Sequence, residues 1–195
     1  SKVPSTTGSA GQVLSVASAN HSSTNAELTW TSEYRKVWGS TVDTTSGTDH
    51  VLLSSIPADC NRFGVGFVQV SADANTVFGI QLSTAGGYVT SNYYSTEGYQ
   101  RSDGYSSQDL TENNLALGGH NWDAAYKFTG NMEANRVKND IWSFTASAWA
   151  DTGTDYNVWS AGYVDLGGAL TAMKAQADDD FDYSQLRAWY EIGGS

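Results

Sequence analysis

Residues 142–148 read Trp-Ser-Phe-Thr-Ala-Ser-Ala, and this stretch decides the fold class. Its apolar side chains alternate with Ser and Thr, and they belong to Trp142, Phe144, Ala146 and Ala148. Successive side chains of a β-strand point to opposite faces, so a period of two places apolar residues on one face and polar residues on the other. The stretch therefore predicts a strand that covers a core on one side only.

The same alternation recurs along the chain. Turn-forming sequences such as residues 85–87 (AGG), 151–153 (DTG) and 178–180 (DDD) separate the alternating runs. Short strands at a spacing of roughly 8–12 residues are typical of an antiparallel β-sandwich or jelly roll. We therefore expect an all-β fold. The residues expected to share one face of their strands are Phe63, Val65 and Phe67; Phe78, Ile80 and Leu82; Val158, Ser160, Gly162, Val164 and Leu166; and Leu186, Ala188, Tyr190 and Ile192.

Two stretches predict finer detail. Residues 168–177 contain good helix formers, but their alternation favours a strand between two others, with one face formed by Thr171, Met173, Ala175 and Ala177. After Phe67 the phase of the apolar residues shifts to Val68 and Val70, which predicts a β-bulge.

Residues 1–32 differ from the rest of the chain. They are small and polar, with short apolar patches at residues 13–16 and 28–30. Such a segment cannot by itself bury enough apolar surface to offset the entropy lost on ordering. We therefore expect an extended shaft or neck segment over residues 1–32, in which three copies wrap together, and a β-sandwich domain over residues 33–195. A flexible linker is the alternative for the first segment.

The net charge of −11 limits the partners of this chain. It argues against binding to nucleic acid, whose phosphates would be repelled, and against adsorption on anionic lipid. No apolar run approaches 18 residues, so membrane insertion is not expected. Uncharged sugars, or anionic sugars through bridging cations, stay open as partners, and the acidity also fits a role in solubility alone. The single cysteine, Cys60, is expected to be a small buried hydrophobe.

No catalytic motif occurs in the sequence, so we expect no enzyme, no cofactor and no metal. Two kinds of metal site are alternatives to this expectation. His21, His50 and His120 could meet on a trimer axis, and the aspartates near residues 178–182 could bind Ca²⁺, although a solvated hairpin tip is the simpler interpretation. A pair of carboxylates in a glycan-cleaving cleft stays open among the 21 acidic residues.

Aromatic residues are the most informative candidates for binding. The chain has seven Trp and eleven Tyr, whose rings stack on the C–H faces of sugars. Residues 92–111 carry four Tyr but little periodicity, which predicts a long functional loop. The candidate receptor contacts are Tyr93, Tyr94, Tyr99, Tyr105, Trp122 and Tyr126, with Trp149, Tyr156 and Trp159 as further candidates. Packing in the core or at a subunit interface is the alternative for each.

Three stretches resemble the C-terminal domains of bacteriophage tail fibres. The first is residues 11–14 (GQVL), followed by residues 28–30 (LTW). The second is residues 80–93, IQLSTAGGYVTSNY, which is similar to a hairpin of that family. The third comprises residues 162–171 and 181–191, which resemble the closing strands. Each stretch by itself is a weak match, and the three in this order are a more specific one.

The resemblance implies a β-sandwich tip and a homotrimer that binds a receptor on the host bacterium. The expected receptor is a polysaccharide. It also implies an extracellular location on the virion. Ser83 and Asn92 stand where the family usually has Gly, and between Asn92 and Trp142 no match is found. That stretch is where we expect host specificity to reside. The alternatives are a carbohydrate-binding module of a secreted enzyme and a glycan-depolymerising tailspike-like enzyme.

Overall fold

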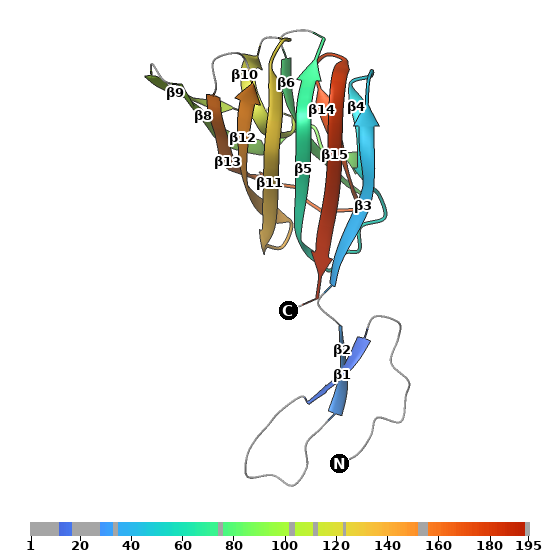
Figure 1. The fold of residues 1–195 in the computed structure, drawn as a ribbon. Coiled ribbons are helices and arrows are strands. Elements are labelled where there is room, and N and C mark those ends of the chain that lie inside the picture. Colours follow the sequence, from blue (N-terminus) through green and yellow to red (C-terminus); the bar gives the residue numbers. More distant parts are fainter. Residues whose placement is uncertain are drawn as a thin grey trace.

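The computed structural model covers residues 1–195 and describes residues 12–16, 28–32, 35–73, 76–101, 104–110, 113–122, 124–151 and 156–193. The described part is an all-β sandwich of two antiparallel sheets (Figure 1). Within it there is no helix long and apolar enough to cross a membrane.

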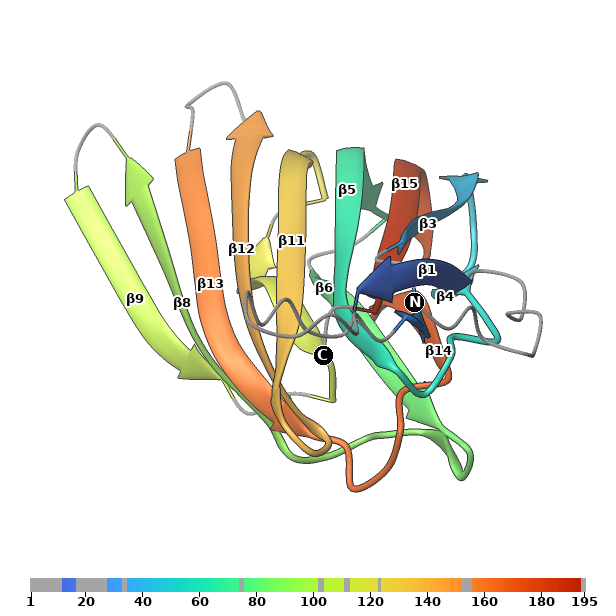
Figure 2. The same cartoon turned by 90° about the horizontal axis from the view of Figure 1, so that it is seen from below.

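The larger sheet has eight strands, and Figure 2 shows them side by side from β9 to β3. Every neighbouring pair in this sheet is antiparallel. In spatial order the strands are β3 (Arg35–Thr44), β15 (Phe181–Ile192), β5 (Cys60–Ala72), β11 (Lys127–Lys138), β12 (Ile141–Asp151), β13 (Tyr156–Asp165), β8 (Tyr93–Arg101) and β9 (Gly104–Leu110).

The smaller sheet has five strands and packs against one face of the larger one. Its spatial order is β10 (Leu115–Trp122), β6 (Thr76–Thr84), β14 (Ala172–Ala177) and β4 (Asp49–Leu53), with β7 (Gly87–Tyr88) paired to β6. β1 (Gln12–Val16) and β2 (Leu28–Ser32) form a separate two-stranded sheet. The strands of that sheet pair only with each other among the described elements, and the wrapping of three copies stays a prediction.

The core lies between the two sheets and is rich in aromatic rings. Phe78 of the smaller sheet packs against Phe67 and Phe128 of the larger sheet, at ring-centroid distances of 5.8 and 5.5 Å. Within the larger sheet, Phe63 and Trp142 pack at 5.2 Å. Edge-on and tilted ring pairs at such distances stabilise a core beyond the area that they bury.

Two buried hydrogen bonds join the sheets directly. The backbone N–H of Leu82 in β6 donates to the Tyr93 hydroxyl of β8 at 3.0 Å. The Ser160 hydroxyl of β13 donates to the carbonyl of Ala116 in β10 at 2.6 Å. Buried polar groups need such partners, so these bonds fix how the sheets face one another.

The strand predictions from alternation are confirmed. Trp142, Phe144, Ala146 and Ala148 are all buried, and the expected strand at residues 168–177 is β14, with Met173, Ala175 and Ala177 buried. The predicted bulge lies in β5. Phe67 and Val70 both point inward there, while Val68 and Gln69 between them are exposed and Gln69 has a positive φ of 52°.

The expectation of a long loop over residues 92–111 is wrong. This stretch forms the β8–β9 hairpin at one end of the larger sheet. The inward positions of β8 include Ser95 and Glu97 as well as Tyr93 and Tyr99, since these residues pair with inward positions of β13. Because polar residues occur on both faces of β8, apolar and polar residues do not alternate along it, and the sequence does not reveal the strand.

Candidate functional site

The candidate site is the outer face, which we define as the face of the eight-stranded sheet that points away from the smaller sheet. Alternation along each strand places here the residues between the core positions, such as Ser143 and Thr145 between Trp142 and Phe144. Large aromatic side chains gather on this face rather than small polar ones alone. Those that are more than a third exposed include Trp38, Tyr94, Tyr105, Trp149, Trp159, Tyr163 and Tyr183.

Tyr105 and Trp159 form a stacked pair at the β9 end of the outer face. Their ring centroids lie 5.4 Å apart at an interplanar angle of 21°, and Tyr105 is 64% exposed. The Trp159 ring lies over Gly98 of the neighbouring strand, where a Cβ atom would collide with it. Glycine at that position allows the indole to lie close to the sheet.

A second stacked pair, Tyr94 of β8 and Tyr163 of β13, lies further along β13. The ring centroids are 5.0 Å apart at 23°, and both rings are about half exposed. They border a shallow hollow of about 320 Å³ that Thr96 and Asp109 also line. The Thr96 hydroxyl donates to the Asp109 carboxylate at 2.9 Å, which holds a hydrogen-bonding group beside the rings.

The β3–β15 end of the outer face carries a tryptophan corner, formed by Trp38 and Trp189. Their centroids lie 6.2 Å apart, with Trp38 50% exposed and Trp189 only 5% exposed. Trp189 is covered because it lies over Gly64 and because the Lys36 ammonium sits 3.5 Å from its ring centroid. Trp38 is therefore the more exposed ring of this corner, with the Lys36 ammonium and the Arg187 guanidinium over it at 4.9 and 4.8 Å from its centroid.

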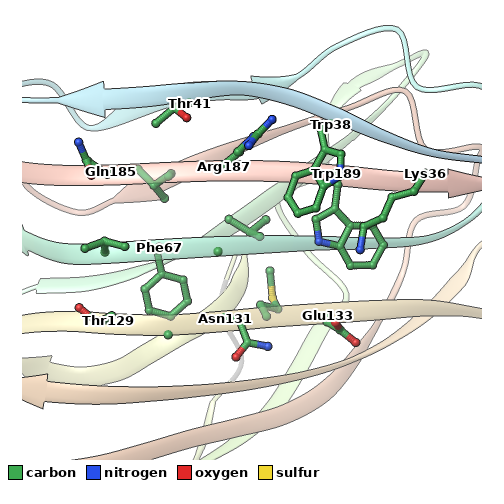
Figure 3. A pocket seen from close by; sticks show the side chains of 16 residues that line it. Lys36, Trp38, Thr41, Phe67, Thr129, Asn131, Glu133, Gln185, Arg187 and Trp189 are labelled. Atoms are coloured by element: carbon green, nitrogen blue, oxygen red, sulfur yellow. The ribbon is translucent and has the colours of Figure 1, made fainter.

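A groove connects the two ends of the outer face. Beside the tryptophan corner it has a volume of about 760 Å³, and Figure 3 shows Arg187, Thr129 and Asn131 around it. It continues into a hollow of about 320 Å³ that is lined by Ser147, Trp149 and Trp159 and shares Thr129 and Asn131. Between the aromatic rings the groove is lined by Thr129, Asn131 and Ser147, and the exposed Val68 adds an apolar side chain.

Of the six predicted contacts, Tyr94 and Tyr105 lie on the outer face. Tyr93 is 1% exposed, and its hydroxyl accepts the inter-sheet hydrogen bond, so it is a core residue and is removed from the candidate site. The reason is its phase: it precedes Tyr94 by one residue and therefore points to the opposite face.

The other predicted contacts lie elsewhere. Tyr99 and Tyr126 are partly buried against the core, where their rings pack on Tyr156 at 5.8 and 5.9 Å. Tyr156 is itself buried, which also removes it from the further candidates. Trp122 ends β10, and its side chain is outside the described part of the chain.

Sequence reasoning missed the tryptophan corner and Tyr163. Trp189 alternates with the core residues Leu186 and Ala188 along its strand, so its position on the outer face could be predicted. Its pairing with Trp38 could not be predicted, because it depends on the register between β15 and β3, which are far apart in the chain.

Residues weighed for other chemistry have structural partners. A ring nitrogen of His50 lies 3.0 Å from the Ser46 carbonyl, and its ring packs on Phe181, while His21 and the side chain of His120 are outside the described residues. Over the residues that the structure describes, no three metal-binding side chains gather. Cys60 is buried, and burial raises its thiol pKa to about 11, which keeps it protonated and unreactive at neutral pH.

No known protein-family model matches this chain, and no curated protein sequence matches it.

Proposed function

We propose that this chain is the receptor-binding tip of a bacteriophage tail fibre and that its outer face binds a glycan on the host surface. The observation that carries the proposal is the set of exposed, stacked rings on one open sheet face, separated by small polar residues. Aromatic faces bind the C–H faces of sugars, and neighbouring polar groups bind the hydroxyls.

The shape of the groove supports a chain-like ligand. From β3 to β13 it crosses five strand-to-strand intervals, on the order of 24 Å at about 4.8 Å each. A ligand of several sugar rings would contact both the tryptophan corner and the Tyr105–Trp159 pair. Because the groove is shallow and open, each contact is weak, and a homotrimer would gain strength by binding with three copies at once.

The test is binding of the labelled chain to an array of bacterial capsular and O-antigen polysaccharides. We expect at least one polysaccharide to bind, and Trp159→Ala or Tyr105→Ala to weaken that binding about tenfold, as expected for losing roughly 1.4 kcal/mol of ring contact. Tyr88→Ala, which removes an exposed ring from the smaller sheet, is the matched control and should bind normally.

Two results would count against the proposal. Absence of binding to every polysaccharide would refute a glycan-binding function, and shortening of the bound polysaccharide would indicate a glycan-cleaving enzyme. Light scattering on the purified chain tests the assembly separately. A trimer supports the tail fibre, whereas a stable monomer would favour a carbohydrate-binding module.

A further inference from the structure

The tryptophan corner differs from the rest of this acidic chain in its charge. The net charge is −11, with ten Lys and Arg in total. Three of these cations, Lys36, Arg62 and Arg187, project from β3, β5 and β15 around Trp38 and Trp189. The charge that this corner presents to a ligand depends on the carboxylates that lie beside these three cations.

Two of the three cations are already neutralised. The Arg62 guanidinium lies 2.5 Å from the Glu133 carboxylate and 3.7 Å from that of Glu191. The Lys36 ammonium lies 3.9 Å from Glu191 and rests on the Trp189 ring. These pairs hold Trp189 in place, and neither cation is left with its charge unmatched.

Arg187 is different. Its Nε–H donates to the Gly39 carbonyl at 3.2 Å, and its guanidinium carbon lies 4.8 Å from the centroid of the Trp38 ring. Among the described residues, no carboxylate lies within 4.0 Å of its guanidinium nitrogens. The side chain is exposed and lines the groove, as Figure 3 shows.

The geometry therefore positions Arg187 for an incoming anion. The bond to Gly39 fixes the plane of the guanidinium, and the two terminal Nη groups have no hydrogen-bond acceptor among the residues that the structure describes. Two parallel N–H donors match the two oxygens of a carboxylate. The Trp38 ring is half exposed, with Arg187 and Lys36 over part of it, and its exposed part offers a flat surface to the ring that carries this carboxylate.

We propose that the tryptophan corner is a subsite for an acidic sugar, with its carboxylate on the Nη groups of Arg187 and its ring on Trp38. This rests on the proposed glycan-binding function and names the class of glycan. The net charge of −11 opposes an anionic ligand, because the chain as a whole repels a negatively charged polymer. Affinity for an acidic glycan must therefore come from a local contact of this kind.

The experiment compares each acidic oligosaccharide with its neutral counterpart. The probes are trimers of galacturonate, glucuronate, guluronate and mannuronate, and the same trimers after reduction of the carboxyl groups to alcohols. Calorimetry on the intact chain should show at least one acidic trimer bound about 10- to 100-fold more tightly than its reduced form, as expected for a charge-assisted pair of hydrogen bonds.

Variants identify the residue responsible. Arg187→Gln should abolish the preference for the acidic trimer and leave affinity for the reduced trimer unchanged. Arg187→Lys should keep only part of the preference, because lysine keeps the positive charge but lacks the two parallel N–H donors of the guanidinium. Lys138→Gln removes one positive charge from an exposed position outside the groove and should leave the preference intact. Melting temperatures establish that each variant is folded.

The outcomes separate the two proposals. Equal binding of acidic and reduced trimers, or equal weakening of both by Arg187→Gln, would overturn the acidic subsite and leave the glycan-binding function standing. Absence of binding to every trimer, together with absence of binding to the polysaccharide array, would overturn the glycan-binding function itself.

Discussion

Two glycines on one strand give a sharp test of the outer face. Gly64 and Gly66 are both on β5, both face outward, and neither has a positive φ. A Cβ on Gly64 would lie 2.5 Å from the Trp189 ring, whereas a Cβ on Gly66 would have no atom within 4 Å. We therefore expect Gly64→Ala and Gly66→Ala to change stability in opposite directions.

The magnitudes follow from these distances. In Gly66→Ala the new methyl group meets nothing, and the reduced entropy of the unfolded chain should stabilise the fold by about 0.4–1 kcal/mol. In Gly64→Ala the ring must move by about 0.9 Å to reach the 3.4 Å of ordinary contact. That shift disturbs its contacts with Lys36 and Trp38, so a net loss of about 1 kcal/mol is expected.

Thermal and urea unfolding followed by circular dichroism measure the difference. A gap of about 2 kcal/mol between the two variants corresponds to about 4–8 °C in Tm for a domain of this size. Repeating Gly64→Ala in a Trp189→Leu background completes a double-mutant cycle, and the penalty should disappear when the ring is absent. Equal Tm changes in both glycine variants, or a penalty that persists without the ring, would refute the reasoning.

Three further predictions concern the core and the tyrosines. Tyr93→Phe leaves the Leu82 N–H buried without an acceptor and should cost about 1–3 kcal/mol in urea unfolding without reducing glycan binding. Burial raises the pKa of Tyr93 to about 12 from 10.0 and that of Cys60 to about 11 from 9.0, so the folded state holds both protons more tightly than the unfolded state. Stability should therefore fall as pH rises above 9 and through 12. Tyr93→Phe should make the fall smaller above pH 10 and end it near pH 11, where the contribution of Cys60 is complete; a flat profile for the unmodified chain would contradict both burials. Tyr94→Ala should weaken glycan binding at unchanged Tm, whereas Tyr99→Ala should lower Tm because its ring packs against the core, and the reverse pattern would invert the assignment of the two faces.

The sequence predicts the sandwich well wherever one face of a strand is apolar. β12 and β14 could be recognised from alternation alone, and so could the bulge in β5. Alternation fails in residues 92–111, because tyrosines occupy both phases of β8 and polar residues share the inward face. A tyrosine in such a strand cannot be assigned to the core or to the surface until the phase is known.

The site was harder to predict than the fold. Tyr105 meets Trp159 because β8 lies between β9 and β13, and Trp38 meets Trp189 because β3 pairs with β15. Both meetings depend on strand order and register over long separations in the chain, which composition and local periodicity do not encode. The sequence therefore predicts which residue types are candidates for binding but not which of them come together.

The pairing of β3 with β15 has a mechanical consequence. Arg35 at the start of β3 lies opposite Ile192 at the end of β15, and the register runs from there to Thr44 and Ser184. A fibre that holds this domain through residues preceding β3 would pull along the axis of that strand. Tension then acts on the ladder in shear and loads its hydrogen bonds together, whereas a pull across the strand would open them one at a time. Under the proposed attachment, tension between the virion and the host would therefore act along β3, the direction in which the hydrogen bonds between β3 and β15 share the load.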